Sequence, residues 1–283
     1  MSRLALAQVT LCAVDARAPA LAAQSLLQSM RHVEFGRVYL FTHGWLPAVV
    51  LPGIDIVDIG PIRSSAEYSN FVMRQLPGYI RTSHALITQW DGFVTHPEAW
   101  TDEFLVYDYI GAVWPEEPEG RNVGNGGFSL RSRRFLAAGL DSRIAQEHPE
   151  DEVLCRSQRP FLEQNHGVRF APARLARRFA FENERPGGIT FGFHGPYNLP
   201  AVLDEATLAE WLQRLPDGFF LSRDARRLAR ALLLRRMPHV AQQLLRRRLA
   251  AGSTDPKTRL LGAAASILQL LAPRASYRRA AGR

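Results

Sequence analysis

The first 200 residues alternate short apolar runs with amphipathic segments. Four runs have the length and apolar content of strands: Leu4 to Val14, Arg37 to Thr42, Ile54 to Ile59 and Ala85 to Ile87. The first is almost continuously apolar, as strands buried on both faces are. The third alternates apolar with acidic residues, which predicts a half-exposed strand.

Helical spacing of apolar residues separates these strands, at Ala18 to Val33 and at Tyr68 to Arg81. Strands that alternate with helices predict an α/β fold with a mostly parallel, Rossmann-like sheet. In such sheets ligands bind beyond the carboxyl ends of the strands. No GxGxxG or P-loop pattern follows the first strand, so the sequence does not support a dinucleotide oxidoreductase or a kinase.

The remainder of the chain is patterned as helices. The predicted stretches are Thr207 to Leu215, Arg223 to Arg236, His239 to Leu249 and Thr258 to Leu271. We therefore expect two domains, an α/β domain over residues 1–203 and a basic α-helical region over residues 204–283.

Charge divides the chain in the same way. The net charge is +8, but residues 221–283 hold 15 Lys and Arg against 2 acids, whereas residues 1–220 hold 20 against 25. Leucines and arginines form a basic amphipathic pattern after Arg223. Such a pattern is typical both of docking to an anionic membrane and of a helical hairpin that packs on the first domain or on a partner. Nucleic acid is not expected, because Tyr277 is the one aromatic residue after Leu221 that could stack a base.

Cysteine content and the N-terminus indicate a compartment. Cys12 and Cys155 are too few for a disulfide framework, and the chain begins without the long apolar stretch of a signal peptide. The longest apolar runs are shorter than a membrane span. We expect a cytoplasmic protein. The basic C-terminal helices further suggest peripheral association with the inner face of the membrane.

Candidate chemistry begins where the Ala85 strand ends. Gln89, Trp90 and Asp91 follow the strand directly, and Gly92 lets the backbone bend away. A carboxylate in this position can reach into a crevice at the sheet edge. Asp-Gly pairs are also common in plain turns, so the pattern alone leaves both interpretations open.

Three later segments add candidate residues. Asn125, Gly126 and Gly127 lie in a glycine-rich loop that permits close approach to a ligand, or forms a flexible turn. Glu150 and Asp151 begin an acidic run that could serve catalysis or stabilise a helix N-terminus. His194 lies in Phe191 to Gly195, between aromatic residues and glycines. A single histidine is more often structural than a ligand, but the nearby glycines suggest an exposed backbone close to a bound group.

Taken in order, five segments resemble nucleotide-sugar glycosyltransferases of the GT-A fold. They are Gln89 to Asp91, Tyr107 to Ala112, Gly124 to Arg131, Pro149 to Asp151 and Phe191 to Gly195. The resemblance covers roughly residues 4–200. It implies a hexosyltransferase-type enzyme with a nucleotide-diphosphate sugar donor. The implied hydroxyl acceptor is a bacterial surface glycan or a lipid-linked glycan, as in polysaccharide biosynthesis.

The resemblance also assigns a divalent metal, held by Asp91 and His194. An imidazole ligand favours Mn²⁺ over Mg²⁺. Gln89 stands where the family's signature has its first aspartate, which lowers the negative charge at the metal. Gln89, Trp90 and Asp91 are then the donor-binding segment.

The remaining roles follow from the same resemblance. Asn125 to Gly127 correspond to the loop beneath the sugar. Asp151, with Glu150 second, corresponds to the catalytic base of an inverting single displacement. Asn70 and Arg74 could face the nucleotide or lie on a solvated helix face.

Two alternatives stay open from the sequence. One is a protein that binds a nucleotide or a sugar without catalysis, which Gln89 favours. The other is a helical interaction module carried on a GT-A-like scaffold.

Overall fold

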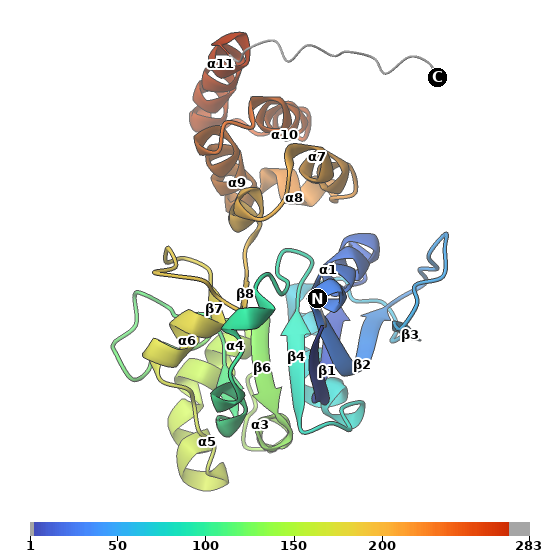
Figure 1. Cartoon of the computed structure of the whole chain (residues 1–283), viewed down its shortest axis with the longest axis vertical. Helices are drawn as coiled ribbons and strands as arrows, with labels where there is room; N and C mark the ends of the chain where they lie inside the picture. The colour runs from blue at the N-terminus through green and yellow to red at the C-terminus, as the bar shows by residue number, and fades with distance from the viewer. Residues whose placement is uncertain (1–2, 272–283) are drawn as a thin grey trace. The chain divides into compact units, whose positions relative to one another are not determined.

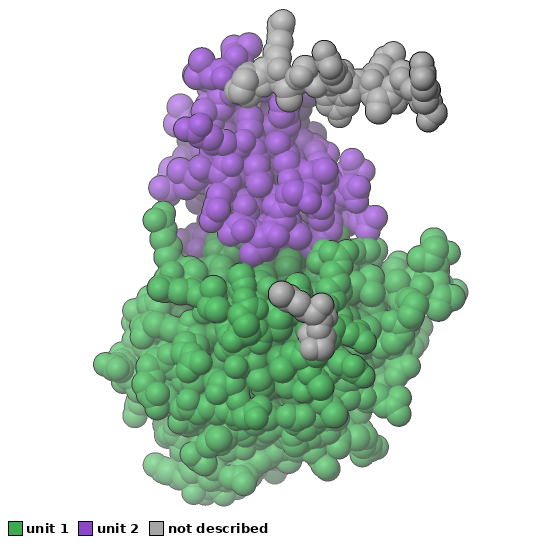
Figure 2. All heavy atoms as spheres, in the orientation of Figure 1, with its two compact units in different colours: residues 1–198 green, residues 199–283 purple. Residues whose placement is uncertain are grey.

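The computed structural model describes residues 3–271. The chain divides into two compact units, Met1–Asn198 and Leu199–Arg283 (Figure 2). The division lies five residues before the expected one after residue 203. Each unit is described by itself below.

A six-stranded sheet forms the centre of the first unit, in the order β3-β2-β1-β4-β6-β5 (Figure 1). The strands are β1 (Leu4–Val14), β2 (Val33–Thr42), β3 (Asp55–Asp58), β4 (His84–Thr88), β5 (Tyr109–Ile110) and β6 (Phe128–Ser132). β1 to β4 pair in parallel, and β6 is antiparallel to both β4 and β5. The expected mixed, mostly parallel α/β sheet with flanking helices is confirmed.

The strand order creates a switch point between β1 and β4. From β1 the chain proceeds outward to β2 and β3, then returns to the other side of β1 with β4. Ligand crevices in open α/β sheets form at such reversals, beyond the carboxyl ends of the strands. β4 ends at Thr88, so the segment that begins with Gln89 emerges at this edge.

Two helical segments follow the local sequence signals closely. α1 (Pro19–His32) has proline in its first turn and buries Leu21 and Leu26. α2 (Ser65–Asn70) is capped by Ser64, whose side chain accepts a hydrogen bond from the Glu67 N–H. It continues as a π-helix, η1 (Phe71–Gln75), and a 3₁₀ turn, η2 (Leu76–Gly78).

Short elements complete the first unit. The helices are η3 (Pro97–Ala99), η4 (Asp102–Val106), α3 (Arg133–Ala138), α4 (Glu150–Glu152), the π-helix η5 (Val153–Ser157), α5 (Arg159–His166), α6 (Ala173–Phe179) and η6 (Pro196–Ala201), which crosses the division. β7 (Ala180–Phe181) and β8 (Gly192–Phe193) form a separate parallel pair. β8 thereby brings the segment before His194 alongside β7.

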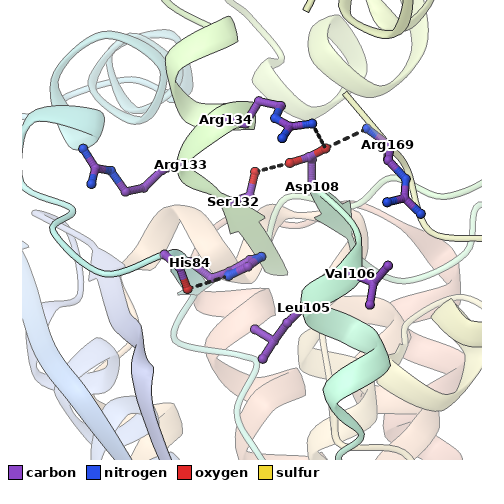
Figure 3. A pocket seen from close by; sticks show the side chains of 9 residues that line it. His84, Leu105, Val106, Asp108, Ser132, Arg133, Arg134 and Arg169 are labelled. Atoms are coloured by element: carbon purple, nitrogen blue, oxygen red, sulfur yellow. Dashed lines mark hydrogen bonds and ion pairs between the residues drawn. The ribbon is translucent and has the colours of Figure 1, made fainter. Parts of the chain in front are cut away.

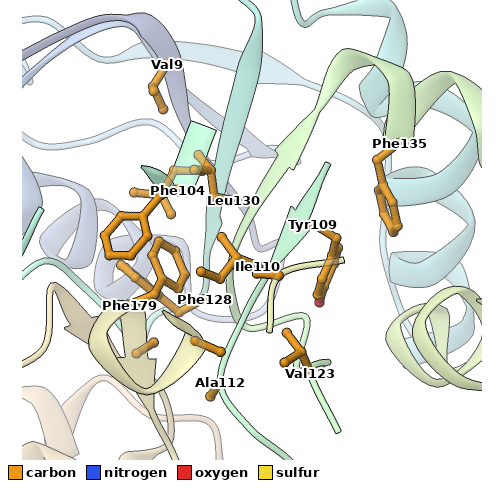
Figure 4. Packing of buried hydrophobic residues seen from close by; sticks show 14 of the residues in the cluster. Val9, Phe104, Tyr109, Ile110, Ala112, Val123, Phe128, Leu130, Phe135 and Phe179 are labelled. Atoms are coloured by element: carbon orange, nitrogen blue, oxygen red, sulfur yellow. The ribbon is translucent and has the colours of Figure 1, made fainter. Parts of the chain in front are cut away.

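Aromatic side chains fill much of the core around β5 and β6 (Figure 4). Phe104, Phe128, Phe179 and Tyr109 are all completely buried. The Phe128 and Phe104 rings each lie 5.3 Å from the Phe179 ring, within the range of favourable aromatic pairs. This packing fixes the strand that carries the glycine-rich loop.

The second unit is helical, as expected. It contains α7 (Glu205–Gln213), α8 (Asp217–Leu221), α9 (Arg223–Leu234), α10 (Pro238–Ala250) and α11 (Pro256–Leu271). α8 is a single turn between Pro216 and Ser222 and was not predicted, because five residues show no helical periodicity. Among residues 3–271, no helix is long and apolar enough to cross a membrane.

The apolar faces of α9 and α10 are used for packing within this unit. Leu228, Leu232, Leu244 and Leu245 are buried. The buried Arg248 side chain donates to the backbone oxygens of Phe220 and Ser222 and to the Thr258 hydroxyl. Packing within this unit accounts for these leucines, whereas docking of the unit to a membrane, to the first domain or to a partner stays a prediction. Tyr277 lies outside the described residues.

Candidate active site

A cavity of about 300 Å³ lies where β4 ends and β6 begins. It brings together seven of the predicted residues: Gln89, Asn125, Gly126, Gly127, Glu150, Asp151 and His194. Its other lining residues are Ser65, Tyr68, Ser69, Trp114, His148, Pro149 and Glu182. Residues more than 100 positions apart in the sequence, such as Gln89 and His194, thus line the same cavity.

The antiparallel ladder between β4 and β6 explains why the Gln89 segment meets the glycine-rich loop. Thr88 pairs with Phe128 at the end of the ladder. The Gln89 N–H then donates to the Gly127 carbonyl oxygen at 2.9 Å. The parallel strand β4 delivers its carboxyl end, and β6 delivers its amino end, to the same edge.

Asp91 lies in a tight turn after this ladder. The Gly92 N–H donates to the Gln89 carbonyl oxygen at 3.2 Å, so the turn interpretation of Asp91-Gly92 is correct as far as the backbone goes. Asp91 is 6% exposed, and its Oδ1 atom is buried without a hydrogen bond. A buried carboxylate oxygen without a hydrogen bond is costly and is suited to a cation.

His194 lies between two carboxylates. Its Nε2 is 3.5 Å from Asp91 Oδ1 and 3.2 Å from Gln89 Oε1, and its Nδ1 is 3.3 Å from Glu182 Oε1. Burial by itself would lower the pKa of His194, but Asp91 and Glu182 raise it well above 6.5. The two carboxylates therefore favour the protonated form of His194 in this geometry.

The glycines are required by protein contacts. A Cβ atom on Gly127 would lie 2.1 Å from His194 Nε2, and one on Gly126 would lie 2.6 Å from Glu150 Oε1. Both distances are shorter than side-chain contacts allow. The loop predicted to approach a ligand thus approaches the His194 ring and the Glu150 carboxylate.

Asn125 holds the loop in shape. Its backbone has a φ of 65°, in the left-handed region that asparagine tolerates. Its side-chain amide donates to Glu182 Oε2 at 2.9 Å, and its backbone carbonyl oxygen accepts from the Tyr109 hydroxyl at 2.8 Å. Asn125 therefore links the loop to the carboxylate beside His194.

Glu150 and Asp151 have different environments. Glu150 accepts a 2.7 Å hydrogen bond from the Arg131 guanidinium, and the two side chains are 5% and 1% exposed. Burial raises the pKa of Glu150, against the opposing effect of Arg131. Asp151 is half-buried and accepts from the Gly126 N–H at 2.9 Å. Both also lie in the first turn of α4, where acids favour the helix N-terminus.

Four predicted residues are not among the lining residues of this cavity: Asp91, described above, and Trp90, Asn70 and Arg74. Asn70 and Arg74 donate to the Glu147 carboxylate at 2.6 Å and 2.7 Å. Arg74 also donates to the carbonyl oxygens of Gly139 and Ile144, so these contacts fix the loop before α4. Trp90 is half-buried and is not a lining residue. Nucleotide contact by Trp90, Asn70 and Arg74 stays a prediction.

Several lining residues were missed by the sequence analysis. His148 is 2.9 Å from the Ser69 hydroxyl and 3.3 Å from that of Ser65, which ties α2 to the segment before α4. The Tyr68 hydroxyl accepts from the Gln89 side-chain amide at 3.3 Å. His148 directly precedes the acidic run, which was an available signal. No sequence signal pointed to Glu182.

The donor atoms suit a divalent cation in kind. The imidazole nitrogen Nε2 of His194 lies 3.5 Å from the Asp91 carboxylate oxygen Oδ1 and 3.2 Å from the Gln89 amide oxygen Oε1. Oxygen and imidazole donors are compatible with Mn²⁺. Within residues 3–271, however, no group of three or more His, Cys, Asp or Glu is arranged to hold a metal. Substrate oxygens would have to complete the shell.

A family model described as a protein of unknown function (DUF5672) matches residues 54–194. No curated protein matches the chain. Among solved structures, the apo form of the glycosyltransferase GlyE of Streptococcus pneumoniae TIGR4 is similar, with a TM-score of 0.40 and 14% identity. That similarity covers 65% of this chain and 53% of the other, so the chain spans about half the length of GlyE.

Two further structures are similar at the same level. The mannosyltransferase PcManGT of Pyrobaculum calidifontis, in complex with GDP-Man and Mn²⁺, has a TM-score of 0.42 and 11% identity, over 93% of this chain and 80% of the other. The galactosyltransferase LgtC, in complex with donor and acceptor sugar analogues, has a TM-score of 0.38 and 13% identity. That similarity covers 89% of this chain and 99% of LgtC. These values are too low to assign a substrate or a metal. The DUF5672 range contains every predicted site residue.

Proposed function

We propose that the protein is a glycosyltransferase that moves a sugar from a nucleotide-diphosphate donor to a hydroxyl of an acceptor. The observation that carries the proposal is the convergence in one cavity of Gln89, Asp151 and His194, with the buried Asp91 Oδ1 in contact with His194 at 3.5 Å. The resemblance of the five sequence segments points to the same activity.

In this proposal Asp151 is the general base. Its Oδ2 accepts from the Gly126 N–H and its Oδ1 from the Glu152 N–H. Each carboxylate oxygen keeps a second acceptor site, so Asp151 can still accept the proton of an acceptor hydroxyl. That hydroxyl oxygen bonds to the anomeric carbon as the bond from this carbon to the diphosphate breaks, with inversion. Glu150 acts through Arg131, because the buried ion pair fixes α4 and the loop carbonyl of Gly126.

Asp91 and His194 would hold a divalent cation, Mn²⁺ in preference to Mg²⁺, with Gln89 beside them. The cation would neutralise the diphosphate as it leaves. Gln89 brings no charge, and His194 would bind the cation as the neutral imidazole, so cation binding would release the proton that Asp91 and Glu182 favour on this ring. Trp90, Asn70 and Arg74 remain proposed donor contacts, and Asn125 to Gly127 remain the proposed floor of the sugar site.

The proposed acceptor is a glycan or a lipid-linked glycan. A lipid-linked acceptor would be met at the inner face of the membrane, where the basic helices after Arg223 would favour anionic lipids. This part of the proposal rests on the charge of the chain, since the leucines of α9 and α10 are buried.

The test is release of nucleoside diphosphate from a panel of nucleotide sugars, measured with and without Mn²⁺ for the wild type and Asp151→Asn. We expect one donor to be turned over and the variant to be slower by about 10²- to 10⁴-fold, the usual contribution of a general base. Binding of a donor without turnover by the wild type would favour the non-catalytic alternative. Equal turnover by Asp151→Asn would contradict the assignment of the base.

A further inference from the structure

A second cavity, here called the basic cavity, lies at the other end of β4 (Figure 3). Its volume is about 680 Å³, and it is lined by Ser83, His84, Leu105, Val106, Asp108, Ser132, Arg133, Arg134 and Arg169. β4 begins at His84, whereas Gln89 follows its last residue. Five residues at about 3.3 Å each separate the two cavities by about 16 Å along the strand.

Three arginines from two segments line the basic cavity. Arg133 and Arg134 begin α3, and Arg169 follows α5. Figure 3 shows Arg133 and Arg169 on opposite sides with their guanidinium groups directed away from each other; both side chains are exposed and can turn toward a bound anion. One lining residue, Asp108, is acidic. The lining therefore carries more positive than negative charge, although residues 1–220 as a whole are acidic.

Asp108 is already engaged by other groups. It accepts from the Ser132 hydroxyl at 2.6 Å and from the Arg169 backbone N–H at 2.9 Å. Its one ion pair is a long contact of 3.8 Å to Arg134. Among residues 3–271, the Arg133 side chain has no ion pair or hydrogen bond, and the Arg169 guanidinium has one contact, with the Tyr107 ring. Two exposed guanidinium groups are thus available to an anion.

The remaining wall is mixed. His84 is 7% exposed, and its Nδ1 lies 3.0 Å from the Ser83 hydroxyl. Burial lowers the pKa of His84, so the ring supplies a neutral polar surface at neutral pH. Val106 is 51% exposed and lies with Leu105 on the same lining. An occupant can therefore place an uncharged part against these side chains.

We propose that the basic cavity binds a small molecule that carries a phosphate ester. Guanidinium forks match the oxygens of phosphate and form strong charge-assisted hydrogen bonds with it. The volume is within the usual range of small-molecule sites. This site is separate from the proposed donor site, and β6 connects the two, because it runs from the Gly126–Gly127 loop to Ser132 and Arg133.

The test is isothermal titration of inorganic phosphate and of glucose 1-phosphate into the wild type and into Arg133→Ala/Arg169→Ala. This pair leaves the Asp108 contacts with Arg134, Ser132 and the residue 169 backbone in place. The matched control is Arg31→Ala/Arg37→Ala, which removes the same charge from exposed positions outside both cavities. Circular dichroism and melting temperature check that each variant is folded.

We expect both phosphates to bind the wild type, and glucose 1-phosphate to bind more tightly because its sugar also contacts the wall. The Arg133/Arg169 variant should lose about tenfold or more in affinity, as expected for two charge-assisted contacts, and the control should not. Unchanged affinity in the Arg133/Arg169 variant would place the bound phosphate elsewhere and overturn the proposal. So would binding of glucose as tight as that of glucose 1-phosphate.

Discussion

Glu150 and Asp151 are neighbours in the sequence, yet the structure gives them separate tasks. The Glu150 carboxylate faces the buried Arg131 guanidinium, whereas Asp151 lines the cavity with one oxygen bound to the Gly126 N–H. The sequence could place both acids at a helix start, but it could not show which one meets Arg131. That partner is 19 residues away on another element.

Because of this difference, we expect one of two similar substitutions to lower stability and the other to lower activity. Glu150→Gln should lower the free energy of unfolding by about 3–5 kcal/mol, because it leaves Arg131 charged and unpaired inside the protein. Asp151→Asn should change it by less than about 1 kcal/mol while activity falls. Urea unfolding of both variants measures the contrast. Equal stability of the two would show that the Arg131 pair does not hold this segment.

Gly127 allows a second test at the residue scale. Gly127→Ala places a methyl group 2.1 Å from His194 Nε2, so either the ring or the loop must move. We expect a loss of about 1–3 kcal/mol in unfolding free energy, typical of overpacking, together with weaker donor binding.

The matched control is Gly187→Ala, since a Cβ atom there has no neighbour within 4 Å. It should leave both unfolding and donor binding unchanged. Wild-type donor binding by Gly127→Ala would contradict the close contact between this loop and His194.

At the scale of elements, α1 holds the turn that carries Asp91. The Ser29 hydroxyl accepts from the Val94 N–H at 3.1 Å, and the Ser25 hydroxyl donates to the Gln89 and Gly92 carbonyl oxygens. All of these groups are at least partly buried. The helix therefore fixes both ends of the segment between Gln89 and Val94.

Ser29→Ala should leave the Val94 N–H without a partner. We expect a cost of about 1–3 kcal/mol, the usual penalty for an unsatisfied buried group, and weaker binding of any ligand held by Asp91. Arg31→Ala on the exposed face of α1 should cost less than about 0.5 kcal/mol. Chemical denaturation measures both. A silent Ser29→Ala variant would mean that α1 does not restrain this turn.

Elements with strong periodicity were predicted well. The Leu4 to Val14 strand has the same bounds in the structure, and the strand before Gln89 begins one residue earlier than predicted. The antiparallel position of β6 could not be read from its five residues, because it depends on pairing with β4. Glu182 was missed for the same reason, since only the tertiary fold brings it into the cavity, whereas the position of His148 beside the acidic run was a signal in the sequence.

At the scale of the whole molecule, charge and fold divide the chain near the same place. The α/β unit contains every predicted site residue, and the helical unit contains most of the excess positive charge. Composition showed this division directly. Periodicity did not predict which apolar side chains of α11 stay exposed, among them Leu260, Ile267 and Leu270.

The central claim is that the cavity beside Asp91 and His194 binds a nucleotide-diphosphate sugar with a divalent cation. The most direct measurement is a thermal-shift panel of nucleoside diphosphates and their sugars, with and without Mn²⁺, on the wild type and Asp91→Ala. A ligand that binds only the native state raises the melting temperature. We predict stabilisation by one nucleotide that requires Mn²⁺ and is lost in Asp91→Ala. Stabilisation by no nucleotide, or the same stabilisation in Asp91→Ala, would contradict the claim.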